Sequence, residues 1–279
     1  MAFKTILVHV DDSAHAADRI RFAAQMAIEC DAHLIGVSTT GMSRQFFKHI
    51  AADDATPDLE KFAETLRLRA SHTLDKFETI TKQLGVSSVE RRVIEEEISS
   101  GLAMHARYCD LAIIGQTDPH DTSRNANIRF PEIVVLESGG PVLILPFHYD
   151  YQYSGKRILI AWNASPAIRK AIQFSLPILY RAEIVQVVIF NAETHPEIFG
   201  ESPGTDIAQY LARHGITVEI IQRTVKAAIG NALISLSESL GSDLIVMGCY
   251  GHARLREIVL GGTTKTVFKS MTVPVFMTH

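Results

Sequence analysis

The feature that most restricts the fold of this chain is an internal repeat. Three segments of the first half recur, in the same order, in the second half. The matched pairs are residues 6–13 with 158–165, residues 110–115 with 243–248, and residues 141–144 with 274–277. Because unrelated α/β segments rarely give three matches in order, we interpret the chain as two homologous copies of one domain, residues 1–150 and 151–279.

The spacing of the matched segments differs between the copies. The first pair is offset by 152 residues and the other two pairs by 133 residues. The first copy therefore contains 19 additional residues between its first and fourth strands, and we place this insertion at about residues 41–58. Residues 147–155, which join the copies, are aromatic and polar without low-complexity character, so we expect the copies to pack together.

Within each copy, short β-branched runs alternate with segments of helical periodicity, a pattern typical of a parallel sheet with helices on both faces. We therefore predict an α/β fold of two doubly wound, five-stranded parallel-sheet domains. In the second copy we predict strands at 157–162, 184–190, 218–222, 243–248 and 273–277, and helices at 166–180, 205–214, 228–240 and 264–270. Gly215 and Gly241 stand where left-handed helix ends are expected. In the first copy the second helix is predicted to be long, from 59 to 84.

Composition limits the function classes. The formal net charge is −4 and 21% of the residues are charged, without the basic surplus typical of nucleic-acid or anionic-membrane binding. No apolar run approaches 18 residues and the N-terminus lacks signal-peptide features, so we expect a soluble, cytoplasmic protein with no membrane partner. The three cysteines are far apart and the twelve histidines follow no metal-ligand pattern, which predicts free thiols and no metal site.

The most specific pattern follows the predicted fourth strand of the second copy. It consists of Gly248-Cys249-Tyr250-Gly251, nine further residues, and Gly261-Gly262-Thr263-Thr264 at the start of a predicted helix. Ligands of open parallel sheets bind beyond the carboxyl ends of the strands. Glycines let the backbone approach a phosphate, and a helix N-terminus offers free N–H groups and a positive dipole end. The pattern predicts a phosphate-binding loop. Arg254, Arg256 and Lys265 could add positive charge there or be ordinary solvated residues.

This glycine pattern resembles the ATP-binding signature of the universal stress protein family, and the resemblance covers nearly the whole chain, twice. It implies a Rossmann-like, adenine nucleotide α-hydrolase-like fold that binds ATP or AMP, with or without Mg²⁺, in the second copy. In the family a hydroxyl residue directly follows the last glycine, whereas here Gly262 intervenes. The resemblance implies that the nucleotide is lined by Met247, Gly248, Tyr250, Gly251, Gly261, Gly262, Thr263 and Thr264.

The end of the first strand is expected to form the opposite wall of this pocket. The family usually places Asp there, near the adenine and ribose, and this chain has Asp11 in the first copy and Asn163 in the second. The Asn163 amide can both donate and accept hydrogen bonds, although a charge is lost. Ala164 and Ser165 follow, and we expect Ser165 to act chiefly as a helix N-cap. By resemblance Val188 and Ile189 form the apolar adenine wall, while core packing would explain them equally well.

The first copy differs at the corresponding loop. Gly115 is followed by Gln116-Thr117-Asp118 without a second glycine, and no Gly-Gly-Thr-Thr sequence opens the next helix. The loop length is nevertheless conserved between the copies, because Gly115 precedes Pro141 by 26 residues, as Gly248 precedes Pro274. Asp118 and Asp121 would repel a triphosphate. We expect the first copy to be free of nucleotide or to bind another ligand.

These observations predict a stress-response regulatory protein that binds ATP or AMP in its C-terminal domain and has no enzymatic activity or at most slow ATP hydrolysis. One alternative is an adenylating or ATP-hydrolysing enzyme, although the chain has no Walker A motif and no Ser-Gly-Gly-x-Asp-Ser loop after either first strand. The other is a nucleotide-free dimerisation scaffold. The family's dimers imply that residues 141–145 and 274–277 pair or pack across an internal pseudo-two-fold axis, and a further homodimer stays open.

Overall fold

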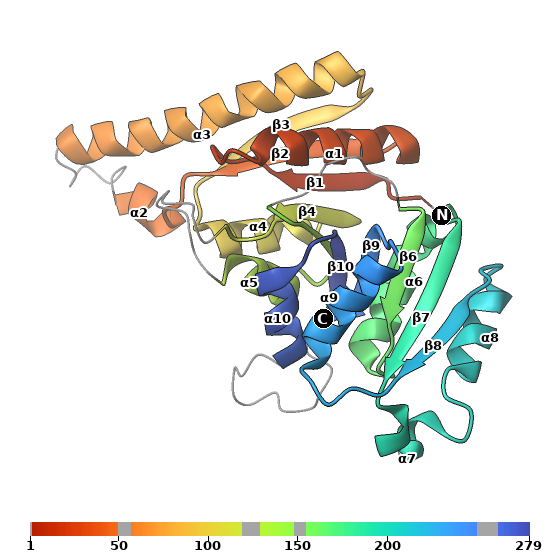
Figure 1. Ribbon diagram of the computed structural model, residues 1–279. Coiled ribbons are helices and arrows are strands. Elements are labelled where there is room, and N and C mark those ends of the chain that lie inside the picture. Colours follow the sequence, from red (N-terminus) through yellow and green to blue (C-terminus); the bar gives the residue numbers. More distant parts are fainter. Residues whose placement is uncertain (1, 50–56, 119–128, 148–154, 250–261) are drawn as a thin grey trace. The chain divides into compact units, whose positions relative to one another are not determined.

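Five strands and their connecting helices make up each half of the sequence (Figure 1). The computed structural model describes residues 2–49, 57–118, 129–147, 155–249 and 262–279. The first half contains β1 (Thr5–His9), α1 (Ala16–Cys30), β2 (His33–Thr39), α2 (Arg44–His49), α3 (Pro57–Leu84), β3 (Val89–Ile94), α4 (Ile98–Ala106), β4 (Leu111–Gly115), α5 (Phe130–Glu137) and β5 (Val142–Leu145).

The second half repeats this plan. It contains β6 (Arg157–Ala161), α6 (Pro166–Leu179), β7 (Ile184–Phe190), a 3₁₀ turn η2 (Ala192–Thr194), α7 (Pro196–Phe199), α8 (Thr205–Arg213), β8 (Glu219–Arg223), α9 (Ile229–Ser239), β9 (Leu244–Gly248), α10 (Gly262–Ser270) and β10 (Val275–Thr278). For every strand of this half, the predicted first and last residues lie within two positions of the observed ones. The short η2 and α7 were not expected from the sequence.

The strand order is the same in both halves. It is β5-β4-β1-β2-β3 in the first half and β10-β9-β6-β7-β8 in the second. The central strands β1 and β6 each pair in parallel with two neighbours, β2 and β4 in one case and β7 and β9 in the other. The predicted α/β fold of two doubly wound, five-stranded halves is therefore confirmed.

The chain divides into two compact units. One unit comprises Ala2–Val142, and the other comprises Leu143–Tyr149 with Ser154–His279. The division falls inside β5, a few residues before the domain limit that the repeat suggested.

A repeated aspartate explains one of the matched sequence segments. Asp110, just before β4, accepts hydrogen bonds from the backbone N–H groups of Lys4 and Thr5 at 2.7 and 2.9 Å. Asp243, just before β9, accepts the corresponding bonds from Lys156 and Arg157 at 2.9 and 3.0 Å. The carboxylate thus satisfies the N–H groups that open the central strand and fixes its register against the fourth strand.

The structure corrects the position of the additional residues of the first half. We assigned them to the 41–58 stretch, but most of the difference lies in the following helix, because α3 has 28 residues and α8 has 9. The predicted long helix, 59–84, agrees with α3. Part of the 41–58 stretch is helical as α2, and residues 50–56 lie outside the described part of the chain.

A glycine in β2 allows a close helix–strand contact in the first half. Gly36 lies in β2 beneath the fully buried ring of Phe77 from α3, and a Cβ at Gly36 would approach that ring to 2.7 Å. A helix this close to the sheet excludes any side chain at position 36.

Two glycines of the second half end helices. At Gly215 after α8 and Gly241 after α9, φ is 75° and 60°, which confirms the predicted left-handed helix ends.

Two further expectations concern the chain as a whole. Cys30, Cys109 and Cys249 form no disulfide in the described part of the chain. In the described part of the chain no helix combines the length and the apolar character needed to cross a membrane.

We expect Gly36→Ala to destabilise the protein by about 1–3 kcal/mol, because the added methyl group overlaps the Phe77 ring in a packed interior. Gly140→Ala is the matched control, since the nearest described atom to its Cβ would be 3.9 Å away and the expected change is within about 0.5 kcal/mol. Urea unfolding of the two variants tests this difference. Equal stabilities would contradict the proposed contact.

Candidate functional site

The candidate site of the second half comprises segments that meet the carboxyl ends of β6 and β9. From β6 the chain continues through α6 to β7 on one side, whereas β9 lies on the other side of β6. The connections leaving β6 and β9 therefore diverge, and a crevice for ligands is expected at such a switch point. The predicted residues 163–165 follow β6, Gly248 ends β9 and Gly262 begins α10.

The turn after β6 is built around Asn163. Its side-chain Oδ1 accepts a hydrogen bond from the N–H of Ser165 at 3.2 Å, and Ala164 between them adopts a left-handed conformation with φ 57°. Ser165 then caps α6, with its hydroxyl accepting a bond from the N–H of Ile168, which confirms the N-cap prediction. Asn163 and Ala164 stay exposed at the edge of the sheet.

Gly248 lets the start of α6 lie directly against the end of β9. A Cβ at this position would be 2.5 Å from the backbone nitrogen of Ile168 and 2.9 Å from the carbonyl carbon of Ala167. Backbone cannot yield as a flexible side chain would, so this contact requires glycine. One role of Gly248 is thus to bring a helix N-terminus to the site.

Gly262 stands in the first turn of α10 and is exposed. A Cβ there would meet no described atom within 4 Å. Thr263 is half-buried, and Thr264 is buried with 4% of its surface exposed. Tyr250, Gly251 and Gly261, which the motif also includes, lie outside the described residues.

The three apolar residues predicted to line the nucleotide, two of them as the adenine wall, are core residues of this half. Val188 and Ile189 of β7 have no exposed surface, and Met247 of β9 is 4% exposed. Their assignment to the pocket stays a prediction. Trp162, which sequence reasoning did not mark, is half-buried at the end of β6 and donates its backbone N–H to the Val188 carbonyl at 2.9 Å.

The matching edge of the first half carries a buried ion pair. Arg19 of α1, 4% exposed, donates from Nε to the His9 carbonyl and from Nη2 to Asp11 Oδ1, both at 2.7 Å. Asp11 Oδ1 also accepts bonds from the N–H and hydroxyl of Ser13. A Cβ at Gly115 would lie 2.5 Å from Arg19 Nη1, so the guanidinium fills the space between α1 and the end of β4.

These contacts shift two pKa values. Burial lowers the pKa of His9 to about 4, an effect that Asp11 opposes and Arg19 reinforces. Burial alone would raise the pKa of Asp11, but the charges of Arg19 and His9 and the hydrogen bonds from Ser13 and Arg19 outweigh it and hold the pKa well below its usual range. Near neutral pH the His9 imidazole is therefore neutral, and beside it Arg19 and Asp11 form an ion pair.

The second half has no counterpart of this pair. The 152-residue offset matches Asp11 with Asn163 and Arg19 with Ala171, which is fully buried in α6. Sequence reasoning missed Arg19. The available signal was an arginine in an apolar stripe of α1, at a position where the other copy has alanine.

Among the described residues no group of three or more histidine, cysteine or carboxylate side chains could hold a metal ion. In the first half His15 Nε2 lies 3.9 Å from Asp118 Oδ2. The hydroxyl of Thr117, which precedes Asp118 in the sequence, is buried and has no hydrogen-bond partner in the described structure. Asp121 lies outside the described residues.

Comparisons with known proteins agree with this architecture. The model of the universal stress protein family matches residues 155–279. A universal stress protein of Synechocystis is 23% identical over 152 residues, which are 52% of this chain and 48% of that protein, so the match spans about half the length of this curated relative. The crystal structure of a universal stress protein from Archaeoglobus fulgidus is 15% identical, covers 98% of this chain and 97% of its own, and has a TM-score of 0.68.

The strand order and the similarity to this crystal structure define a doubly wound α/β fold in both halves of the chain. At the level of sequence, the similarity to the universal stress protein family model covers the second half, residues 155–279. The first half repeats the strand order of the second. Among solved structures of universal stress proteins, one is a complex with cAMP and one, from Archaeoglobus fulgidus, is a complex with dAMP.

The His9 environment predicts a pH-dependent stability. Because the folded-state pKa of His9, about 4, lies below its ordinary value of 6.5, the unfolded chain binds more protons between these values, and stability falls as pH is lowered through this window. We expect His9 to account for about 2 kcal/mol of lost unfolding free energy between pH 7 and pH 4.5. Urea unfolding at several pH values should show a smaller loss for His9→Gln. Parallel pH curves for the two proteins would contradict this.

Proposed function

We propose that the second domain binds an adenine nucleotide, ATP or AMP, with or without Mg²⁺, and that the protein regulates a stress response without enzymatic activity or with at most slow ATP hydrolysis. The observation that carries the proposal is the glycine pattern Gly248-x-x-Gly251, nine residues, Gly261-Gly262. It connects the end of β9 with the start of α10 at the switch point of the sheet.

The start of α10 suits a phosphate group. The first N–H groups of a helix have no partner within it, and the positive end of the helix dipole favours an anion. The first turn of α10 contains no acidic residue. The space beside Gly262 would admit a ligand close to the backbone, and Thr263 would add a hydroxyl donor.

The turn after β6 suits the adenosine part. Asn163 is exposed and uses Oδ1 to hold Ser165, so its amide NH₂ group would donate to an acceptor on the ribose or the base. An uncharged side chain here, in place of the family's usual aspartate, avoids repulsion of nearby phosphates. We expect Met247, Val188 and Ile189 to support the base from within the core.

The two alternatives are less well supported. In an adenylating or ATP-hydrolysing enzyme of this superfamily we would expect a Ser-Gly-Gly-x-Asp-Ser-type loop after the first strand, and the sequence here is Asn163-Ala164-Ser165. A nucleotide-free scaffold would not need the complete glycine pattern. The regulator accounts for both observations.

Regulation by a bound nucleotide has a simple physical basis. A ligand that binds the folded state alone stabilises it by about 2.7 kcal/mol at a concentration of 100 times its Kd. A bound nucleotide would link the β9–α10 connection to the turn after β6, and a partner protein could distinguish the occupied domain from the empty one. The three free cysteines support a reducing compartment such as the cytoplasm.

We expect Gly261→Val to abolish ATP binding and Gly262→Ala to weaken it by about tenfold or more, because each adds a side chain where the backbone should approach a phosphate. Gly262→Ala should leave the fold intact, since its Cβ would meet no described atom within 4 Å. Isothermal titration gives affinity and stoichiometry, and fluorescence of Trp162, the chain's single tryptophan, reports binding independently.

Gly140→Ala is the control on the first domain and should bind ATP normally. Circular dichroism establishes that each variant is folded before its binding is compared. The proposed site would be wrong if Gly261→Val still bound ATP, or if the unmodified protein bound two nucleotides per chain.

A further inference from the structure

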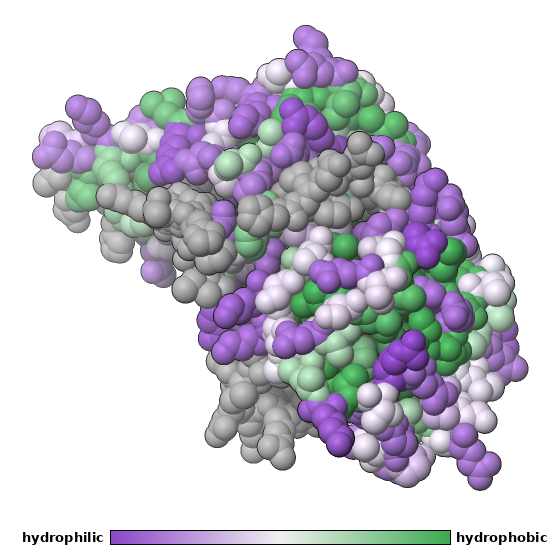
Figure 2. All heavy atoms as spheres, viewed as in Figure 1, coloured by the Kyte–Doolittle hydropathy of each residue, from purple (hydrophilic) through white to green (hydrophobic). Residues whose placement is uncertain are grey.

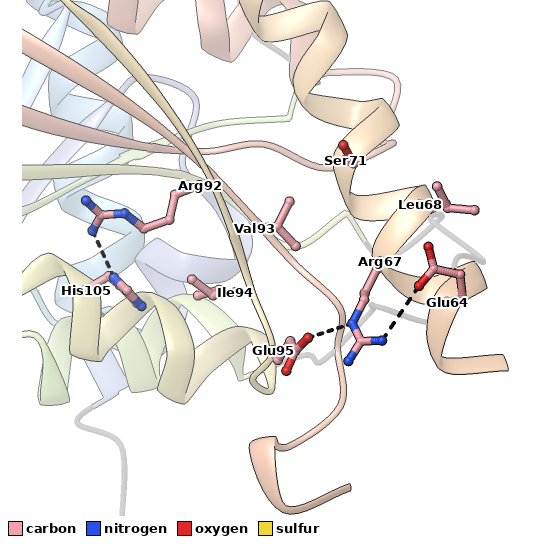
Figure 3. Close-up of a pocket in the computed structure, with 9 residues that line it drawn as sticks. All are labelled: Glu64, Arg67, Leu68, Ser71, Arg92, Val93, Ile94, Glu95 and His105. Carbon is pink, nitrogen blue, oxygen red and sulfur yellow. Dashed lines mark hydrogen bonds and ion pairs between the residues drawn. The ribbon is translucent and has the colours of Figure 1, made fainter. Parts of the chain in front are cut away.

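The outer strand of the first domain, β3, has an open side. Strand β2 pairs with it on one side. Along the other side runs a groove of about 670 Å³ between α3 and α4 (Figure 3). Leu68 of α3, Val93 of β3 and His105 of α4 are among its lining residues. On the visible face along α3, hydrophobic side chains are scattered among hydrophilic ones (Figure 2).

The hydrogen bonds to β2 show which backbone groups of β3 point outward. The carbonyls of Ser88 and Ile94 accept bonds from the N–H groups of Leu34 and Thr40. Successive residues of a strand direct their N–H and C=O groups to opposite sides. Val89, Arg91 and Val93 therefore point their backbone groups outward, where no described strand pairs with them.

The side chains of β3 alternate between two faces. Arg91 extends toward α3, and its Nη1 lies 3.0 Å from Asp75 and 2.8 Å from Glu78. Glu90 and Arg92 lie on the opposite face, where Arg92 donates to Glu90 Oε1 at 2.9 and 2.6 Å. Figure 3 shows Arg92 directed to His105, away from α3.

We propose that β3 pairs with β3 of a second copy of this chain, antiparallel and centred on Arg91. If the two-fold axis passed between two residues, a residue whose backbone N–H and C=O groups point outward would face a residue whose groups point toward β2, and the two could not form hydrogen bonds. The centre must therefore be Val89, Arg91 or Val93, and Arg91 gives the longest overlap. In this register the outward groups of all three residues form ladder hydrogen bonds.

The side chains of β3 are self-complementary in this register. Glu90 of each copy lies opposite Arg92 of the other, and Val89 lies opposite Val93. The two valines are 43% and 37% exposed in the single chain, and both kinds of cross-strand pair stabilise an antiparallel ladder. The two Arg91 side chains meet at the axis, each already compensated by Asp75 and Glu78.

Charged residues on an outer strand can also serve to prevent edge pairing. The outer strand of the second domain, β8, is of this kind. Its Arg223 carbonyl accepts a bond from Asn191, so Ile220 and Gln222 point outward. Pairing Glu219 with Arg223 of another copy would require a centre at Ile221, which points inward. The self-complementary register is therefore available to β3 and not to β8.

Sedimentation equilibrium of the full chain tests the proposal. The unmodified protein should form a dimer of the 30.8 kDa chain. Glu90→Arg and Arg92→Glu each set like charges opposite one another and should raise the dimer dissociation constant by roughly tenfold or more. The double variant Glu90→Arg with Arg92→Glu restores opposite charges and should recover the original constant.

Proline variants test the backbone part of the ladder. Val93→Pro removes an outward N–H and should also weaken the dimer, whereas Gln222→Pro, at an outward position of β8, should leave it unchanged. Circular dichroism checks that both are folded. A monomer at all concentrations, or a dimer whose dissociation constant in Glu90→Arg and Val93→Pro equals that of the unmodified protein, would overturn the proposal.

Cross-linking tests the position of the axis. A residue on the axis faces its own copy at about 5.5 Å between Cα atoms, within the range of a disulfide. Arg91→Cys should therefore form a covalent dimer under mild oxidation. Val89→Cys should not, because in this register position 89 of one chain lies far from position 89 of the other. The reverse result would place the axis elsewhere and overturn the register.

Discussion

Everything at the candidate site depends on one strand in each half having two parallel neighbours. β1 pairs with β2 and β4, and β6 pairs with β7 and β9. Parallel strands end at the same edge, so the segments that leave β6 and β9 emerge side by side although Ala161 and Gly248, the last residues of these strands, are 87 positions apart in the sequence. Asp110 and Asp243 hold this arrangement at the opposite edge by accepting the first N–H groups of the central strand. A residue can then contribute to the site through its position at a strand end, without being near its partners in the sequence.

The two domains use the space beside the central strand differently. In the second domain Gly248 lets the start of α6 lie directly against β9. The residue of α6 that corresponds to Arg19 is the small, fully buried Ala171. In the first domain Arg19 fills the corresponding space and engages Asp11, the residue that the family resemblance would assign to a nucleotide. A carboxylate bound to a buried guanidinium and to Ser13 has little capacity left for a ligand. The ion pair is thus a second reason, besides the missing glycines, to expect different ligand binding in the two domains.

The proposals also assign different tasks to the two domains. The second would bind the nucleotide, and the first would join two chains through β3. Each task rests on backbone groups that need partners: the first turn of α10 in one case and the outward groups of β3 in the other. The long helix α3 belongs to the second of these features, because it forms one wall of the groove beside β3 and supplies Asp75 and Glu78 to Arg91.

The sequence by itself determined the repeat, the fold class, nearly all strand and helix positions of the second half, the long α3 and the N-cap role of Ser165. These features depend on local periodicity, on glycine and cap chemistry, and on comparison of one half with the other. Only the tertiary structure decided that Arg19 is buried between α1 and β4, that Val188 and Ile189 have no exposed surface, that the additional residues lie mainly in α3, and that β3 presents a self-complementary edge. Those properties depend on which segments meet in space and which backbone groups remain unpaired, and both are set by the order of the strands, which a periodic pattern does not encode.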